Sequence, residues 1–302
     1  NMVNIAKQRA AAKPGLSVTF EVRDATTTEF EPESFDVVYS RDTLLHIHGK
    51  PELFRRFLGW LKPGGQLFIS DYSRDFPEVT PENRDLSETF EAYVAQRGYH
   101  LMTPAAYGDV VKGAGFATAK ATDETDLFES SLRRELETTR GSRDAFVSEF
   151  TEEDYDYIMQ GWEKKLTFVA GGFQKWAIVH AFKAGAEGRS DESKSAELTS
   201  EQLDTTQYTE VGILRYERIF GAGFVSTGGK VTTTEFLSRL NLKPGMRVLD
   251  VGCGIGGGDF LMAELYGVEV VGIDLSTNMV NIAKQRAAAK PGLSVTFEVR
   301  DA

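Results

Sequence analysis

An apolar run that ends in a cluster of glycines constrains the fold of this chain most strongly. Residues 246–254 read MRVLDVGCG, and Gly-Gly-Gly-Asp follows at 256–259. A buried parallel strand that enters a tight turn has this pattern, and the last glycines open a helix. The sequence therefore predicts a strand–turn–helix unit in which the backbone can approach a nucleotide closely.

Apolar runs of strand length alternate with amphipathic segments along the rest of the chain. The patterns predict helices over 52–61, 104–115 and 277–290, and strands over 35–40, 65–72, 175–184, 268–276 and 293–302. Such alternation predicts an α/β fold with a mostly parallel sheet and helices on both faces. The acidic, amphipathic residues 127–165 predict helices over the carboxyl edge of the sheet, where they could form a lid.

The first 25 residues are repeated at the other end of the chain. Residues 1–25 are identical to residues 278–302. The two copies begin 277 residues apart, which is the size of a whole domain. The chain is therefore interpreted as one period, cut mid-domain, of a tandem array, or as a circular permutant with overlapping ends. Residues 1–184 would hold the C-terminal part of one domain from its third strand onward, 185–202 a polar linker, and 203–302 the N-terminal, nucleotide-binding part. We expect one copy to pack and the other to fray or to exchange with a neighbouring chain.

Charge and cysteine content exclude several classes of function. The net charge of −11 argues against a general binder of nucleic acid or of anionic membranes. A single cysteine, Cys253, excludes an intrachain disulfide and a multi-cysteine metal site, which favours a reducing compartment. Because no signal peptide and no apolar run of membrane-spanning length are apparent, we expect a cytoplasmic protein without stable membrane insertion and without a metal.

Acidic residues stand at three successive strand ends. Asp250 precedes the glycines, Asp274 ends the next strand, and Asp301, with its twin Asp24, ends the third. These positions suit a cationic amino-acid tail, a pair of ribose hydroxyls and an adenine amino group, respectively. A dinucleotide enzyme, which holds pyrophosphate at the helix N-terminus, is the alternative, and an acid directly before the glycines disfavours it.

Several longer segments resemble one known family, the phosphoethanolamine N-methyltransferases, and most closely the second catalytic domain of the tandem plant-type enzymes. The most specific are QYTEVGILRYERIFGAGFVSTGG (207–229), FDVVYSRDTLLHI (35–47) and EAYVAQRGYHL (91–101), joined by VLDVGCGIGGGDF, VVGIDLSTNMV, LKPGGQLFISDY and GWEKKL. The resemblance covers nearly the whole unique chain. It implies a class I (Rossmann-like) methyltransferase with a seven-stranded sheet, S-adenosylmethionine as cofactor, and N-methylation of phosphoethanolamine or its mono- and dimethyl forms toward phosphocholine.

Residue by residue, the resemblance also implies a site. Tyr208 and His46 match the catalytic pair, and Asp42 matches the partner of the substrate amine. The positions that match the phosphate-binding residues are Tyr72, Tyr93, Arg97, Tyr99 and Lys165. The predicted cofactor-binding residues are Tyr216, Ser226, Gly252 and Arg41 near the methionine end, Asp274 at the ribose, Asp24 and Ala25 at the adenine, and in addition Asp250, Gly254 and Leu275.

The chemistry of methyl transfer accounts for these residue types. The amine must lose a proton, because an ammonium has a pKa near that of lysine, about 10.4, and His46 is a natural base because imidazole titrates near 6.5. Arg97 and Lys165 supply charge for a phosphate, and tyrosines supply directional donors. The alternatives are a methyltransferase of the same fold acting on a glycine- or sarcosine-type amine or a lipid-like acceptor, and an inactive cofactor-binding module.

Overall fold

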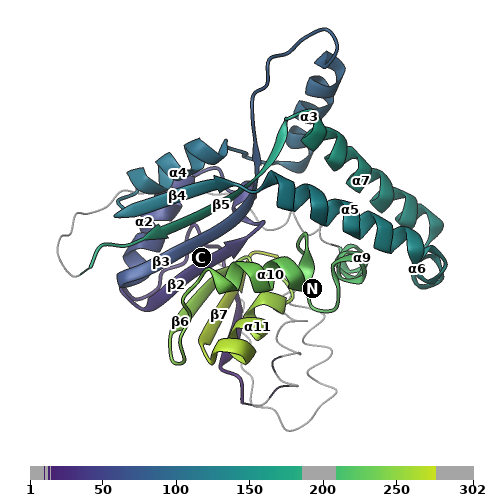
Figure 1. The fold of residues 1–302 in the computed structure, drawn as a ribbon. Helices are drawn as coiled ribbons and strands as arrows, with labels where there is room; N and C mark the ends of the chain where they lie inside the picture. Colours follow the sequence, from purple (N-terminus) through teal and green to yellow (C-terminus); the bar gives the residue numbers. More distant parts are fainter. Residues whose placement is uncertain (1–9, 11–12, 14, 186–208, 277–302) are drawn as a thin grey trace.

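The computed structural model describes residues 10, 13, 15–185 and 209–276, and these residues build one seven-stranded sheet with helices on both faces (Figure 1). The strand order is β1-β7-β6-β2-β3-β5-β4. All neighbours run parallel except β5, which is antiparallel to β3 and to β4. The strands are β1 (Val18–Val22), β2 (Phe35–Arg41), β3 (Leu61–Arg74), β4 (Thr118–Asp123), β5 (Gln174–Phe182), β6 (Arg247–Val251) and β7 (Glu269–Asp274). The predicted mostly parallel α/β sheet is thus confirmed.

Segments from the two ends of the chain are neighbours in this sheet. Strand β6 lies between β7 and β2, with Leu249 paired to Val271 on one side and to Val38 on the other. Strand β1 comes from the first copy of the repeat and pairs with β7. The helix expected over 277–290 and the strand expected over 293–302 lie outside the described residues. The permuted order and the domain boundaries remain predictions.

Alternation along the central strands gives the sheet two apolar faces. Val37 and Tyr39 of β2 pack in a core with residues of α10 (Gly229–Ser238) and α11 (Gly257–Tyr266). Val38, between them in sequence, packs in a second core with residues of α2 (Lys50–Trp60) and α4 (Pro104–Gly113). Because successive side chains of a strand point to opposite faces, one apolar strand can serve both cores.

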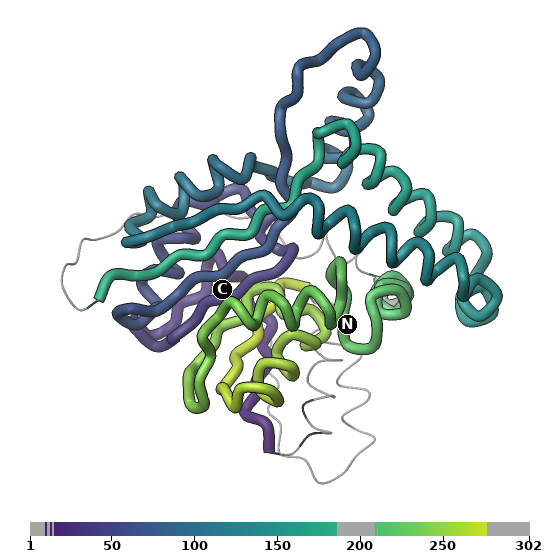
Figure 2. Tube along the Cα trace, viewed as in Figure 1, coloured from purple at the N-terminus to yellow at the C-terminus, as the bar shows by residue number. Residues whose placement is uncertain are grey.

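A helical layer extends beyond the sheet (Figure 2). It consists of α5 (Thr125–Gly141), α6 (Arg143–Glu149) and α7 (Glu152–Ala170), which together cover the segment in which helices were predicted. Helices α3 (Arg84–Arg97) and α9 (Glu210–Phe220) lie nearby, and Trp162 of α7 packs against Tyr216 of α9. Among the described residues, no helix combines the length and apolar character needed to cross a membrane.

Candidate active site

A pocket of about 960 Å³ opens at the carboxyl ends of β1, β2, β6 and β7, where parallel α/β sheets bind ligands. Helix α7, the end of α3 and α9 supply its other walls. Sixteen of the predicted site residues line this single pocket, namely Asp24, Ala25, Arg41, Asp42, His46, Tyr72, Tyr93, Arg97, Tyr99, Lys165, Tyr216, Ser226, Gly252, Gly254, Asp274 and Leu275. Asp250 does not line it, and Tyr208 lies outside the described residues.

The glycine-rich turn after β6 brings the backbone close to the loop after β2. Gly252 has φ +83°, and a Cβ atom at this position would lie 1.9 Å from Oγ1 of Thr43. Its N–H donates to the carbonyl of Ile273 at 2.8 Å. Both the left-handed backbone and the close approach therefore require glycine here.

Two of the predicted acids point into the pocket with fixed orientations. Asp274 accepts the N–H of Gly254 at 3.0 Å and the N–H of Ser276 at 3.1 Å, one on each carboxylate oxygen. Asp24 accepts the backbone N–H and the hydroxyl of Thr26, each at 2.7 Å. These bonds hold the carboxylates on the wall that joins β7 to β1.

The third acid has a different environment from the one we expected. Asp250 is buried beneath the glycine-rich turn, where its nearest acidic neighbour is the fully buried Asp259 of α11. Burial raises the pKa of Asp250 to about 7, and burial together with the neighbouring charge of Asp250 raises the pKa of Asp259 well above its ordinary value. Asp250 does not line the pocket, so its contact with a ligand's cationic tail stays a prediction.

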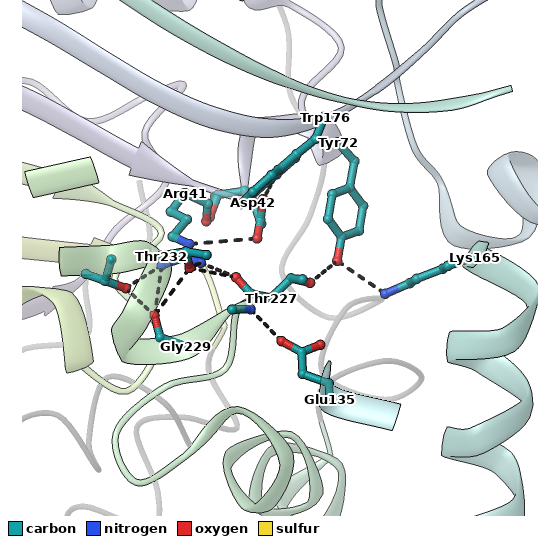
Figure 3. Close-up of polar contacts among 12 residues, drawn as sticks. Arg41, Asp42, Tyr72, Glu135, Lys165, Trp176, Thr227, Gly229 and Thr232 are labelled. Atoms are coloured by element: carbon teal, nitrogen blue, oxygen red, sulfur yellow. Dashed lines mark hydrogen bonds and ion pairs between the residues drawn. The ribbon is translucent and has the colours of Figure 1, made fainter. Parts of the chain in front are cut away.

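Asp42 stands at the carboxyl end of β2 in a strained conformation. Its φ of +47° is left-handed, which is uncommon for a residue other than glycine and is often found at functional sites. The indole N–H of Trp176 donates to Oδ1 at 3.0 Å, and Nε of Arg41 lies 4.0 Å from Oδ2 (Figure 3). Burial raises the pKa of Asp42, while Arg41, Trp176 and Lys165 act in the opposite direction.

His46 lies in a short 3₁₀ turn, Leu44–His46, with its ring 5.1 Å from the ring of Tyr99. Burial lowers its pKa to about 4, and the charges of Lys50, Arg97 and His100 lower it further in the same direction. The imidazole is therefore neutral at pH 7 and able to accept a proton. It is a weaker base than the ordinary imidazole that we expected from the sequence.

The predicted phosphate-binding residues form one aromatic and cationic cluster. The ring of Tyr99 lies 5.8 Å from that of Tyr93 and 6.3 Å from that of Tyr72. Lys165 donates to the hydroxyl of Tyr72 at 3.2 Å, and the guanidinium of Arg97 lies 5.7 Å from the ring centre of Tyr93. Burial raises the pKa of all three tyrosines, that of Tyr93 to about 12, so their hydroxyls stay protonated. Two cations and three donors thus face the same space.

Arg41 connects the two ends of the chain instead of pointing only at the pocket. It is buried, and its guanidinium donates to the carbonyl of Thr227 and to the hydroxyls of Thr232 and Thr233. These partners belong to α10 and to the loop that precedes it. The guanidinium therefore anchors the loop that carries Ser226 to the end of β2.

The sequence did not single out four buried residues that support the site. Trp176 holds Asp42, and Thr227 bonds to Tyr72 at 3.1 Å. Glu135 accepts the N–H of Gly228 and the indole N–H of Trp162. Lys50 donates to the carbonyls of Ile47 and His100, each at 2.8 Å. Of these, Trp176 lies in a predicted strand, and Thr227 lies in the segment 207–229 that carries the resemblance. Among the described residues, no group of three acidic, histidine or cysteine side chains could hold a metal ion.

The sheet order and the glycine-rich turn define a class I methyltransferase fold. The family model described as "Methyltransferase domain" matches residues 1–69, and the model described as "Mycolic acid cyclopropane synthetase" matches residues 230–300. The solved structure of Haemonchus contortus phosphoethanolamine N-methyltransferase 2, in complex with phosphomonomethylethanolamine and S-adenosylhomocysteine, aligns with a TM-score of 0.50 and 33% identity. The alignment covers 53% of this chain and 36% of the Haemonchus contortus chain.

Within this class, the chain is similar to phosphoethanolamine N-methyltransferases. It is 49% identical over 183 residues to phosphoethanolamine N-methyltransferase 1 of Triticum aestivum, an alignment that spans 61% of this chain and 35% of the wheat protein. Identity to the Plasmodium falciparum enzyme is 31% over 185 residues, or 61% of this chain and 66% of that one. The resemblance inferred from the motifs is confirmed, and the chain spans about a third of the length of the plant relatives it matches.

Proposed function

We propose that the protein transfers a methyl group from S-adenosylmethionine to the amino nitrogen of phosphoethanolamine or of its mono- and dimethyl forms, toward phosphocholine. One observation carries the proposal: two cations and three tyrosine hydroxyls share a pocket with Asp42, His46 and the glycine-rich turn. The names of the similar enzymes support it, because they are phosphoethanolamine N-methyltransferases.

The residues at the carboxyl ends of β6, β7 and β1 fit the cofactor. The turn at Gly252 has no room for a side chain, so a ligand there would meet backbone, and Asp274 and Asp24 hold oriented carboxylates on the adjoining wall. Tyr216 and Ser226 line the same pocket. When bound, S-adenosylmethionine supplies an electrophilic methyl group on a sulfonium.

The aromatic and cationic cluster fits a phosphate dianion. Burial lowers the pKa of Lys165 to about 8, and repulsion by the charge of Arg97 acts in the same direction. A bound dianion would relieve this repulsion, and the protonated hydroxyls of Tyr72, Tyr93 and Tyr99 would donate to its oxygens. The cluster therefore fits a ligand with two negative charges.

Asp42 and His46 fit the amine end of the same substrate. A buried carboxylate beside the indole of Trp176 would hold an ammonium and still tolerate added methyl groups. His46 is neutral, as a proton acceptor must be, and a phosphate that offsets the charge of Arg97 would raise its pKa toward that of an ordinary imidazole. Tyr208 remains its proposed partner, although it lies outside the described residues.

Two other substrates for the same fold are less well matched to the cluster. A glycine- or sarcosine-type substrate carries one negative charge, on its carboxylate. It would therefore neutralise only part of the positive charge of Arg97 and Lys165. A lipid-like acceptor has some support from the Escherichia coli cyclopropane-fatty-acyl-phospholipid synthase, which is 48% identical over 63 residues, 16% of that enzyme. The charged and hydroxyl-bearing end of the pocket argues against an acyl chain there.

The test is transfer of a radiolabelled methyl group from S-adenosylmethionine to phosphoethanolamine, its monomethyl and dimethyl forms, and sarcosine. We expect label on the phosphobases, and Arg97→Met should raise KM for them about tenfold or more, since a charged hydrogen bond is worth about 1.5–3 kcal/mol. Arg133→Met is the matched control, because Arg133 is an exposed arginine on α5. Label on sarcosine alone would contradict the proposal, and cofactor binding without transfer would favour an inactive module.

We also propose a cytoplasmic location and, as a macromolecular partner, a tandem domain or a domain-swapped second copy. The single cysteine and the exact repeat of residues 1–25 support these proposals. Fractionation of cells that express the protein tests the location. Light scattering after size-exclusion chromatography tests the second copy, since a strict monomer would contradict a swap.

A further inference from the structure

A chain of hydrogen bonds runs from the phosphate cluster to the loop on the cofactor side (Figure 3). Lys165 donates to the hydroxyl of Tyr72 at 3.2 Å, and that hydroxyl lies 3.1 Å from Oγ1 of Thr227. The Thr227 side chain is fully buried. Its neighbour Ser226 lines the pocket and is one of the proposed contacts of the cofactor. One threonine thus has its hydroxyl on the phosphate side and its backbone in the cofactor-side loop.

The same loop is held from two further directions. Arg41 donates to the carbonyl of Thr227, and the N–H of Gly228 donates to Oε1 of Glu135 at 2.5 Å. The other oxygen of Glu135 accepts the indole N–H of Trp162 at 2.8 Å. Because Trp162 lies on α7 together with Lys165, the position of this loop depends on the helix that carries part of the phosphate cluster.

The donors and acceptors along this chain fix its direction once an anion binds. A tyrosine hydroxyl has one hydrogen and two acceptor sites, and a lysine ammonium can only donate. If Tyr72 gives its hydrogen to a phosphate oxygen, it must accept from both Lys165 and Thr227. The Thr227 hydroxyl then becomes the donor, and each bond of the chain strengthens the next.

We propose that Thr227 is a positioning residue that couples the binding of the phosphate group to the binding of the cofactor, a role that rests on the function proposed above. The phosphate orders the bond between Tyr72 and Thr227, and this bond fixes the loop that carries Ser226 against the cofactor. Since coupling between two sites is reciprocal, the cofactor tightens the phosphobase by the same factor.

The test measures the Kd of S-adenosylhomocysteine by calorimetry on the full chain, with and without saturating phosphoethanolamine, a pair that cannot react. In the unaltered protein we expect phosphoethanolamine to tighten S-adenosylhomocysteine about tenfold, within the usual range of coupling. Thr227→Val keeps the shape and removes the hydroxyl, so the factor should fall to about 1–2 while each ligand alone still binds. Thr227→Ser should keep the coupling. Thr234→Val, at an exposed threonine of α10, is the matched control and should leave it unchanged.

Five results would overturn the inference. Thr227→Val with full coupling, or Thr227→Ser without it, would refute a role for the hydroxyl. Binding of both ligands to the unaltered protein without coupling would refute the inference and leave the proposed function intact, whereas no binding of phosphoethanolamine at all would refute both. If Thr227→Val does not fold, Tyr72→Phe breaks the chain at its other end, and full coupling in that variant would equally overturn the proposal.

Discussion

If the pocket holds a phosphate group as proposed, the pKa of Lys165 sets how strongly its affinity for that group depends on pH. Burial lowers this pKa to about 8, with Arg97 acting in the same direction and Glu135 and Asp42 opposing it. An ordinary lysine titrates near 10.4, so it would stay charged across the range in which Lys165 loses its proton. With a pKa of about 8, about nine-tenths of the Lys165 side chains are charged at pH 7 and roughly one in thirty at pH 9.5. If the charged form binds, the Kd should rise about 10- to 30-fold over this interval.

Phosphocholine is the ligand that isolates this effect. Its quaternary nitrogen does not titrate, and a phosphate monoester, with its second pKa near 6, is already a dianion at pH 7. The Kd is measured by calorimetry from pH 7 to 9.5 for the unaltered protein and for Lys165→Arg, whose guanidinium stays charged throughout. Burial also lowers the pKa of Lys50 to about 8, and because Lys165→Arg leaves Lys50 in place, any dependence that remains in this variant belongs to Lys50 or to another group.

Two results would refute this reasoning. A Kd that is flat from pH 7 to 9.5 in the unaltered protein would mean that Lys165 does not hold the phosphate or keeps an ordinary pKa. An equal rise of Kd in Lys165→Arg would assign the titration to another group. A third measurement checks the sign: since the dianion favours the charged lysine, binding at pH 8.5 should take up part of a proton, which appears as a dependence of the heat on the buffer.

Three further predictions test other parts of the site. Trp176→Phe removes the hydrogen bond that lowers the pKa of Asp42, so the acidic limb of the pH–rate profile should move to higher pH and kcat/KM should fall about 10-fold or more; an unmoved limb would contradict the assignment. Gly252→Ala places a Cβ 1.9 Å from Thr43 in a left-handed backbone, and calorimetry should find cofactor affinity at least about 10-fold weaker. Asp259→Asn removes a carboxyl whose folded pKa is raised. That carboxyl costs stability as pH rises above its unfolded pKa, so urea unfolding should show the variant about 1–3 kcal/mol more stable at pH 8 and unchanged at pH 4.

Five of the seven strands could be predicted at their observed places because each is an apolar run between turn residues, and β1 has the sequence of the strand expected over 293–302. Strand β4 could not, since its residues TAKATD are small or polar and alternate between exposed and half-buried. It is an edge strand, paired on one side only with β5, so little apolar surface marks it. Its pairing comes from tertiary context, which a local pattern does not contain.

Pocket residues that lie in a recognisable motif could be predicted from the sequence. The buried residues that hold them in place could not. Asp42 and His46 lie in one continuous segment that resembles a known family, whereas Glu135 reaches Gly228 across 93 positions of the sequence. The lowered pKa of His46 could not be predicted either. It results from burial and from the charges of Lys50, Arg97 and His100, which come close to His46 only in the folded protein. Local sequence identifies a reactive side chain, but its electrostatic environment comes from segments that are distant in the chain.

The site depends on one junction, at which the strands from the two ends of the chain meet. Strand β2 pairs with β6, the hydroxyl of Ser40 donates to the carbonyl of Val251 at 2.7 Å, and Thr43 lies against Gly252. If the two parts separated, the facing edges of β2 and β6 would lose their ladder of hydrogen bonds, and the buried guanidinium of Arg41 would lose its partners in α10. A ligand that touches both parts binds only the closed arrangement, so its binding energy adds to the stability of the junction. The order in which the chain connects the strands is therefore secondary to the register with which β2 and β6 meet.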